Sequence, residues 1–228
     1  MTVTMSIPRS HVSGPTDVAG PYAEERRALA DIGSLFYTRN WSLGTSSNYS
    51  IVVQRDPLRL LITASGRDKR ALRPADFVII DEAGRPIDPP NERPSAETLL
   101  HTTLARHAGA GSILHTHSVW GTVLSDRYFR AGQIEITGYE MIKGIAGHAS
   151  HEDRLRVEIF DNTQDMAALS QKVADRLADV KRPLQHAFLL RGHGLYTWAT
   201  DVAEARRHIE IFEFLFEVIG RSDPVHPA

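Results

Sequence analysis

The feature that most constrains this chain is a pair of histidines at the end of an apolar run, His115 and His117, with His193 far downstream between two glycines. Residues i and i+2 of an extended strand point to the same face, so both imidazoles can reach one ion while Thr116 faces away. A catalytic zinc typically has three protein ligands and leaves one position for water or substrate. The pattern therefore predicts that the segments around residues 115 and 193 meet at one metal ion.

The alternative interpretation of the pair is partly buried packing, because the chain contains eleven histidines. The glycines beside the third histidine favour the metal interpretation. Gly192 and Gly194 permit positive φ and a close backbone approach, which would place His193 on a tight turn after a strand at 187–190. Three further histidines fall within helical patterns and are interpreted as surface or packing residues: His101, His107 and His208.

Composition indicates ordinary globular material. The chain has 228 residues, of which 42% are hydrophobic and 24% are charged, enough for one substantial core. A formal net charge of −2 gives no basic bias for holding a phosphate backbone, so no nucleic-acid partner is expected. No run reaches membrane-spanning length. With no cysteine, thiolate chemistry is excluded and a cytoplasmic setting is expected, so metal ligands must be His, Asp or Glu.

The hydrophobic pattern predicts one domain after a loose start. Residues 1–20 are rich in Pro, Ser and Gly without a signal-peptide pattern and are expected to form a flexible tail, and 21–228 a single catalytic domain. Helices are expected at 22–39, 96–107 with Ser95 as N-cap, 165–180 and 202–219, with a short one through Val123. Strands are expected at 49–53, 59–63, 77–81, 112–117, 133–136, 156–160, 187–190 and 195–198. Without a regular βαβ rhythm, this order predicts an α/β (α+β-like) fold with a central, mostly antiparallel sheet flanked by helices.

Five sequence blocks in register resemble the class II aldolase and adducin head family, over about residues 22–219. They are Gly44-Thr45-Ser46-Ser47-Asn48, Ile62-Thr63-Ala64-Ser65-Gly66, Arg93-Pro94-Ser95-Ala96-Glu97, His115-Thr116-His117 and Arg191-Gly192-His193-Gly194. Within that family, the segments 140–144 and 159–163 look like the branch of methylthioribulose-1-phosphate dehydratases in methionine salvage. The resemblance implies a class II aldolase-like fold, a small phosphorylated ketose as substrate and a homotetramer with sites near subunit boundaries.

The activity that the resemblance implies is removal of water from 5-methylthioribulose 1-phosphate, giving 2,3-diketo-5-methylthiopentyl 1-phosphate. His115, His117 and His193 would hold one Zn²⁺ per subunit. The metal would stabilise the charge formed when the C3 proton leaves. The C4 hydroxyl is a poor leaving group and needs an acid, and the family has a glutamate at the position of Glu140 for acid/base work.

Both candidate acid/base glutamates also have structural interpretations. Gly138 and Tyr139 suggest a strand-to-helix turn, where Glu140 would favourably cap a helix start. Glu97 is the second candidate, because related sugar-phosphate aldolases have a glutamate there beside the zinc. It could equally be a first-turn helix residue behind Ser95.

The phosphate group needs hydrogen-bond donors, which turns rich in Gly, Ser and Thr provide. Six residues match family positions that hold the phosphate: Thr45, Ser46, Asn48, Ser65, Gly66 and Ser95. Their alternative interpretation is simple turn chemistry. The chain departs from the family at Ser47, where glycine is common, and at Ala96, where the aldolases have a second serine.

Two other functions remain open at this point. One is a sugar-phosphate aldolase or epimerase of the fuculose or ribulose phosphate type, which would use the same metal and differ only in the fate of the intermediate. The other is a non-catalytic interaction domain, since the same fold occurs as a cytoskeletal head domain that does not require the metal. The three histidines favour an enzyme.

Overall fold

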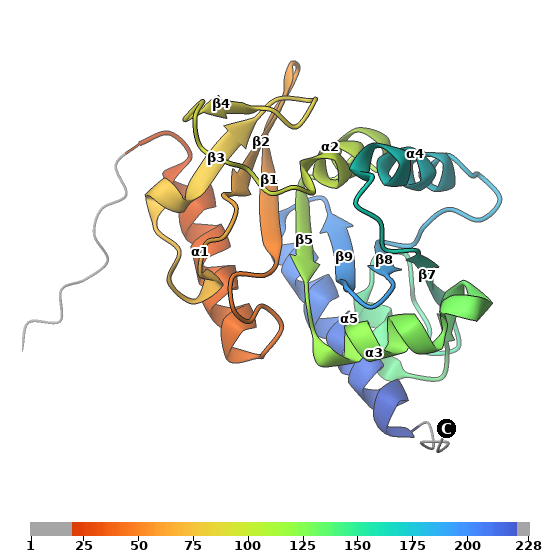
Figure 1. Ribbon diagram of the computed structural model, residues 1–228. Helices are drawn as coiled ribbons and strands as arrows, with labels where there is room; N and C mark the ends of the chain where they lie inside the picture. Colours follow the sequence, from red (N-terminus) through yellow and green to blue (C-terminus); the bar gives the residue numbers. More distant parts are fainter. Residues whose placement is uncertain (1–19, 223–228) are drawn as a thin grey trace, which may run out of the picture.

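A computed structural model describes residues 20–222 and shows a nine-stranded sheet in that part of the chain, with helices on both faces (Figure 1). The strand order is β4-β3-β2-β1-β5-β9-β8-β7-β6. The strands are β1 (Asn48–Arg55), β2 (Leu58–Thr63), β3 (Phe77–Ile80), β4 (Pro86–Asp88), β5 (Ser112–Thr116), β6 (Gln133–Ile136), β7 (Leu155–Phe160), β8 (Ala187–Leu190) and β9 (Gly194–Ala199). Neighbouring strands are antiparallel apart from β7 and β8. The predicted mostly antiparallel sheet is confirmed.

The helices divide between the two faces of the sheet and create two hydrophobic cores. They are α1 (Ala23–Thr38), α2 (Thr98–His107), α3 (Val119–Arg127), α4 (Met166–Leu177) and α5 (Val202–Ser222). Buried residues of α1, α3 and α5 pack on one face, and those of α2 and α4 pack on the other. Period-2 alternation in β5 decides what each face receives: Leu114 joins the α5 core and Ile113 the α2 core. His115 therefore faces α2, whereas Thr116 faces α5.

Several local predictions need correction. Strand β4 was not predicted, because three residues beginning with a proline are too few to show a period. Helix α2 begins at Thr98 after Glu97, so Ser95 is not its N-cap; the Ser95 hydroxyl instead accepts a hydrogen bond from the Glu97 backbone N–H. His117 lies one residue beyond the end of β5. The tail predicted at 1–20 lies, apart from Gly20, outside the described residues.

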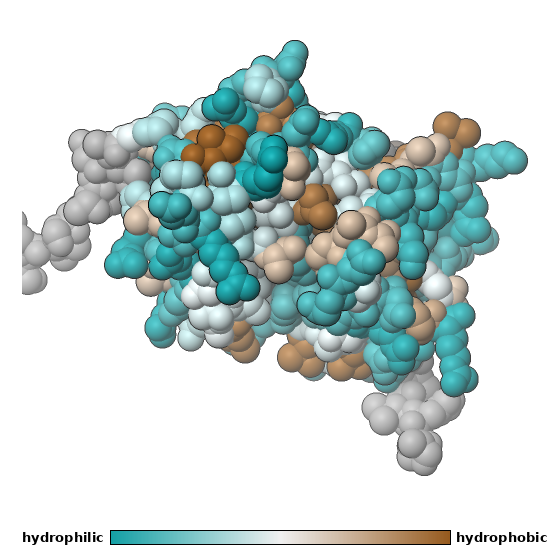
Figure 2. All heavy atoms as spheres, turned by 45° about the horizontal axis from the view of Figure 1, so that its top comes forward, coloured by the Kyte–Doolittle hydropathy of each residue, from teal (hydrophilic) through white to brown (hydrophobic). Residues whose placement is uncertain are grey.

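None of the helices within residues 20–222 combines the length and apolarity that crossing a bilayer requires. On the face seen in Figure 2, hydrophobic residues occur in small groups among hydrophilic ones.

Candidate metal centre

The three histidines singled out in the sequence lie together at the end of β5. The Nε2 atoms of His115 and His117 are 2.8 Å apart, those of His117 and His193 are 3.1 Å apart, and those of His115 and His193 are 3.3 Å apart. A tetrahedral ion with nitrogen ligands at 2.0–2.1 Å would separate them by about 3.3 Å. The three nitrogens thus fit three of the four ligand positions of a tetrahedral site.

Burial favours the neutral form of His115 and His117, which is the form that binds metal. Burial lowers the pKa of His115 well below its usual range, and burial followed by the nearby His115 lowers the pKa of His117 to about 3. The Nδ1 of His115 donates to the Leu195 carbonyl at 2.9 Å, which leaves the lone pair on Nε2. On His193, Nδ1 lies 3.3 Å from the Asn162 side-chain oxygen.

Two glycines bring the third histidine to the site. Gly192 has φ +59°, a left-handed conformation that favours glycine, and the His193 N–H donates to the Leu190 carbonyl at 3.1 Å to close the turn. At Gly194, a Cβ atom would lie 2.0 Å from the Thr116 carbonyl oxygen. The β8–β9 turn can therefore approach the end of β5 only with glycine at position 194.

Glu97 reaches the same cluster from the residue before α2. Its Oε1 lies 3.5 Å from His193 Nε2 and its Oε2 lies 3.6 Å from His115 Nε2. The Asn48 amide nitrogen donates to Oε2 at 2.6 Å. The Glu97 side chain makes no cap hydrogen bond to α2, so its position serves the cluster rather than the helix. A carboxylate there could accept a proton from a substrate atom or donate an oxygen ligand.

A cavity of about 210 Å³ opens beside the cluster and includes all six residues predicted to hold phosphate. Its lining is Thr45, Ser46, Ser47, Asn48, Ala64, Ser65, Gly66, Ser95, Ala96, Glu97 and His117. Ser47, which stands where the resembling family often has glycine, has φ +72°. The structure thus keeps the glycine-like backbone at this position at a cost of about 1–2 kcal/mol.

Sequence reasoning missed Lys69, whose ammonium lies near the backbone of Thr45, a residue that lines this cavity. Lys69 is 1% exposed, and its ammonium donates to the Arg67 carbonyl at 2.8 Å and approaches the Thr45 carbonyl at 3.5 Å. Gly33 of α1 allows close packing, since a Cβ there would lie 2.5 Å from the Lys69 carbonyl oxygen. Burial lowers the pKa of Lys69 to about 8. The only signal in the sequence was its place three residues after Gly66.

Glu140 does not join the cluster within one chain. It begins the short 3-10 helix η4 (Glu140–Gly144), and its side chain is 72% exposed. It pairs with Lys143 and lies 3.9 Å from His151, and the hydrogen bond from Lys143 lowers its pKa. It is not among the residues that line the cavity.

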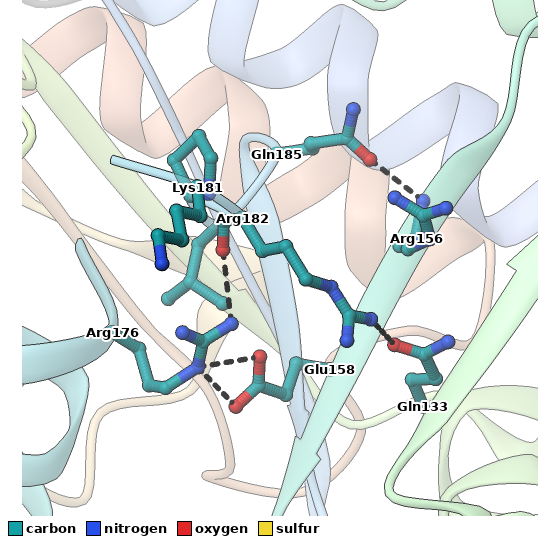
Figure 3. A pocket seen from close by; sticks show the side chains of 9 residues that line it. Gln133, Arg156, Glu158, Arg176, Lys181, Arg182 and Gln185 are labelled. Carbon is teal, nitrogen blue, oxygen red and sulfur yellow. Dashed lines mark hydrogen bonds and ion pairs between the residues drawn. The ribbon is translucent and has the colours of Figure 1, made fainter. Parts of the chain in front are cut away.

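A second cavity, of about 200 Å³, lies beside β6 and β7, and the arginines and the glutamate that line it already have partners (Figure 3). Arg176 binds both carboxylate oxygens of Glu158, at 2.8 and 2.9 Å, and Arg182 donates to Gln133 at 3.0 Å. No histidine lines it. Its contacts tie the segment before β8 to the sheet edge, and the histidine cluster remains the candidate site.

Comparison with known sequences agrees with this geometry. The model of the family described as class II aldolase and adducin N-terminal domain matches residues 27–219. A methylthioribulose-1-phosphate dehydratase from Marinobacter nauticus is 46% identical over 198 residues, covering 86% of this chain and 92% of the relative. An enzyme of the same name from Pseudomonas aeruginosa is 45% identical over 190 residues, covering 83% and 90%.

Comparison with solved structures shows the same fold at much lower identity. L-fuculose-1-phosphate aldolase from Thermus thermophilus superposes with a TM-score of 0.70 at 21% identity, covering 88% of this chain and 95% of its own. A sugar-phosphate aldolase from Thermotoga maritima gives a TM-score of 0.65 at 17% identity, with 91% and 99% covered.

Proposed function

This chain belongs to the family of class II aldolase and adducin N-terminal domains, and we propose on that premise that it is a hydro-lyase that removes water from 5-methylthioribulose 1-phosphate. The product would be 2,3-diketo-5-methylthiopentyl 1-phosphate. Two features support the proposal: relatives at 45–46% identity carry that activity in their names, and Glu97 stands beside three converging histidine nitrogens. The position of Glu97 beside the three histidines is the observation on which the proposed chemistry depends.

His115, His117 and His193 would hold a divalent ion, and we propose Zn²⁺. Three imidazole nitrogens suit that ion, and a three-histidine set leaves a position for substrate oxygens. The ion supplies positive charge that favours loss of the proton from C3, next to the C2 carbonyl.

The reaction needs one group to take the C3 proton and one to protonate the leaving hydroxyl at C4. We assign the first role to Glu97, which lines the cavity and lies 3.5–3.6 Å from two of the histidine nitrogens. We assign the second to Glu140, as the family resemblance implies. When the C3–H and C4–O bonds break, water leaves, and the resulting enol becomes the 2,3-diketone.

Glu140 can fill that role only from a neighbouring copy of the chain, because within its own chain it pairs with Lys143 and His151 on the surface. This agrees with the homotetramer that the resemblance implies, with sites near subunit boundaries. The test is to mix two inactive variants, His115→Ala and Glu140→Gln, under conditions that exchange subunits. Hybrid oligomers should regain activity, because some sites then combine an intact cluster with an intact Glu140. Mixtures that stay inactive after proven exchange would contradict the assignment.

The phosphate would occupy the cavity of about 210 Å³, held by Thr45, Ser46, Asn48, Ser65, Gly66 and Ser95. The buried ammonium of Lys69 would supply positive charge behind this site. Its hydrogen bonds within residues 20–222 go to two backbone carbonyls, while Asp68 and Asp76 act on it only through their charges, so a phosphate would be a further partner.

Product analysis tests the proposed reaction directly. Zinc-loaded protein is given 5-methylthioribulose 1-phosphate, and the products are followed by NMR. Formation of the diketone with loss of water is the expected result. Dihydroxyacetone phosphate with methylthioacetaldehyde would instead identify the aldolase alternative. An unchanged substrate, together with no metal binding, would favour the non-catalytic interaction domain.

A further inference from the structure

Two pairs of polar residues interleave between β1 and α2, behind the candidate site. Asn48 and Ser50 are two apart on β1 and face α2, while Glu97 and His101 are four apart at the start of α2. His101 and Ser50 are fully buried. The contacts run in order: Asn48 Nδ2 to Glu97 Oε2 at 2.6 Å, His101 Nε2 to Asn48 Oδ1 at 2.5 Å, and Ser50 Oγ to His101 Nδ1 at 2.7 Å.

The direction of every hydrogen bond in this series follows from the Asn48 amide. Its nitrogen donates to the Glu97 carboxylate, so its oxygen is turned toward His101. His101 must then carry its proton on Nε2, which leaves Nδ1 to accept from the Ser50 hydroxyl. Burial lowers the pKa of His101 to about 4, so the ring is neutral at physiological pH. One tautomer of His101 therefore satisfies all four residues.

The Tyr196 ring contacts both His101 of the series and His115 of the histidine cluster. Its ring stacks on His115, with centroids 4.0 Å apart and planes at 15°, and meets His101 edge-on at 5.9 Å. Its hydroxyl is buried and has no hydrogen-bond partner among the described residues. A hydrogen bond in such a water-poor interior is stronger than one at the surface, and an unpaired polar group there is costly, which resists rearrangement of the series.

We propose that Ser50, His101 and Asn48 form a directional hydrogen-bond chain that positions the Glu97 carboxylate beside the histidine cluster. His101 is thus a positioning residue and not, as its helical spacing suggested, a packing residue. The inference rests on the role proposed for Glu97. It adds that the orientation of the base is set by a group two hydrogen bonds away, on the same helix.

The tautomer of His101 tests the chain without any reference to activity. His208 is a matched internal control: it is also fully buried, but its Nε2 accepts from the Ala146 N–H and its Nδ1 lies 3.2 Å from the Trp198 carbonyl, so it must carry the proton on Nδ1. Long-range ¹H–¹⁵N spectra of protein labelled at histidine rings should show His101 protonated on Nε2 and His208 on Nδ1. The variants His101→Gln and His208→Gln assign the two signals. An Nδ1-protonated or doubly protonated His101 would overturn the proposal.

Steady-state kinetics test whether the hydrogen-bond chain affects the proposed catalytic role of Glu97. Loss of an outer hydrogen-bond partner typically costs 10- to 100-fold, so His101→Phe should lower kcat by about that factor, with KM changed less than about threefold and metal content unchanged. His101→Gln, whose amide can still donate to Asn48, should recover most of the loss. His208→Phe controls for replacing a buried histidine. Ser50→Ala is the milder variant should His101→Phe fail to fold, and it should reduce kcat in the same direction.

The outcomes separate this inference from the proposed function. If Glu97→Gln is inactive while His101→Phe and Ser50→Ala retain full kcat, the proposed positioning role of the hydrogen-bond chain is wrong and the role of Glu97 stands. If Glu97→Gln is itself fully active, the role of Glu97 fails, whatever the tautomer. A His101→Phe protein that loses metal as well as activity would also contradict a role confined to Glu97.

Discussion

The two faces of β5 carry buried polar groups of opposite character. On the α2 face, His115 meets two other histidines and Glu97, and its Nδ1 donates to the Leu195 carbonyl. On the α5 face, Thr116 donates to the buried Glu213 at 2.9 Å, while the other carboxylate oxygen of Glu213 has no hydrogen-bond partner among residues 20–222. Burial raises the pKa of Glu213 to about 7.

This contrast separates two uses of a buried carboxyl group. Glu97 lies at the edge of an open cavity, with the Asn48 amide donor 2.6 Å from its carboxylate. Glu213 lies between a helix and a sheet, 3% exposed, where its charged form is penalised. The first is suited to moving a proton to and from a ligand. The second supports the strand that carries the histidines.

Replacing neighbouring residues of β5 gives the largest expected difference between the two faces. His115→Ala should abolish metal binding and activity together, exceeding the roughly 10- to 100-fold that loss of an outer hydrogen-bond partner costs. Thr116→Val should retain metal and most activity and lose about 1–3 kcal/mol of stability, because Glu213 loses its donor. Metal analysis, turnover and urea unfolding measure the three quantities. Equal metal loss in both variants would show that the faces do not differ in function.

The two glutamates should differ nearly as strongly. Glu97→Gln should lower kcat by about 10²- to 10⁴-fold, the usual contribution of a general base, with the metal retained. Glu213→Gln is expected to change kcat by less than about threefold, since the neutral amide can still accept from Thr116. Steady-state kinetics on both zinc-loaded variants measure this. A Glu213→Gln variant as inactive as Glu97→Gln would assign the α5 face a part in the chemistry.

Local sequence patterns predicted the α2 face far better than the α5 face. Period-2 alternation placed His115 and Thr116 on opposite sides, and the glycines around His193 indicated its turn. Glu213 and Phe214 show where such patterns fail, because the glutamate is 3% exposed and the phenylalanine 46% exposed, the reverse of their hydropathy. That reversal depends on which side of α5 meets β5, a property of the tertiary packing.

Contacts between distant segments were likewise beyond sequence reasoning. The family resemblance placed Asn48 among the phosphate contacts, and it does line the cavity, but its amide is directed at Glu97 and His101. Those contacts join residues about fifty positions apart, and no local pattern encodes them. The burial of Lys69 depends in the same way on the packing of α1 against it.

Lys69 is expected to affect substrate binding more than the chemical step. Lys69→Met keeps the apolar stem and removes the charge, so KM should rise about 10- to 100-fold, equivalent to 1.5–3 kcal/mol for a charged hydrogen bond, with a smaller change in kcat. Inhibition by inorganic phosphate should weaken in parallel. Lys172→Met, at an exposed position of α4, serves as the control. A normal KM in Lys69→Met would mean that this lysine has a structural role only, joining the backbone segments at Thr45 and Arg67.

The smallest expected effect on activity, in Glu213→Gln, comes with a distinctive pH dependence of stability. The folded pKa of about 7 exceeds the ordinary value of 4.5, so the folded protein holds a proton that the unfolded chain releases between these values. The stability that Glu213 contributes is therefore fully present below pH 4.5 and is lost as pH rises through 7, by about 3 kcal/mol in total. Glu213→Gln removes this loss.

Urea unfolding of the metal-free proteins between pH 4.5 and 8 measures this effect. Subtracting the free energy of unfolding of the wild type from that of the variant removes the contribution that the histidines make to both. That difference should grow in favour of Glu213→Gln as pH rises. Glu210→Gln, on the same helix but only partly buried, should follow the wild-type curve. A constant difference between Glu213→Gln and wild type would mean that Glu213 is already charged at low pH, and the two carboxyl groups would then not differ in the way their surroundings imply.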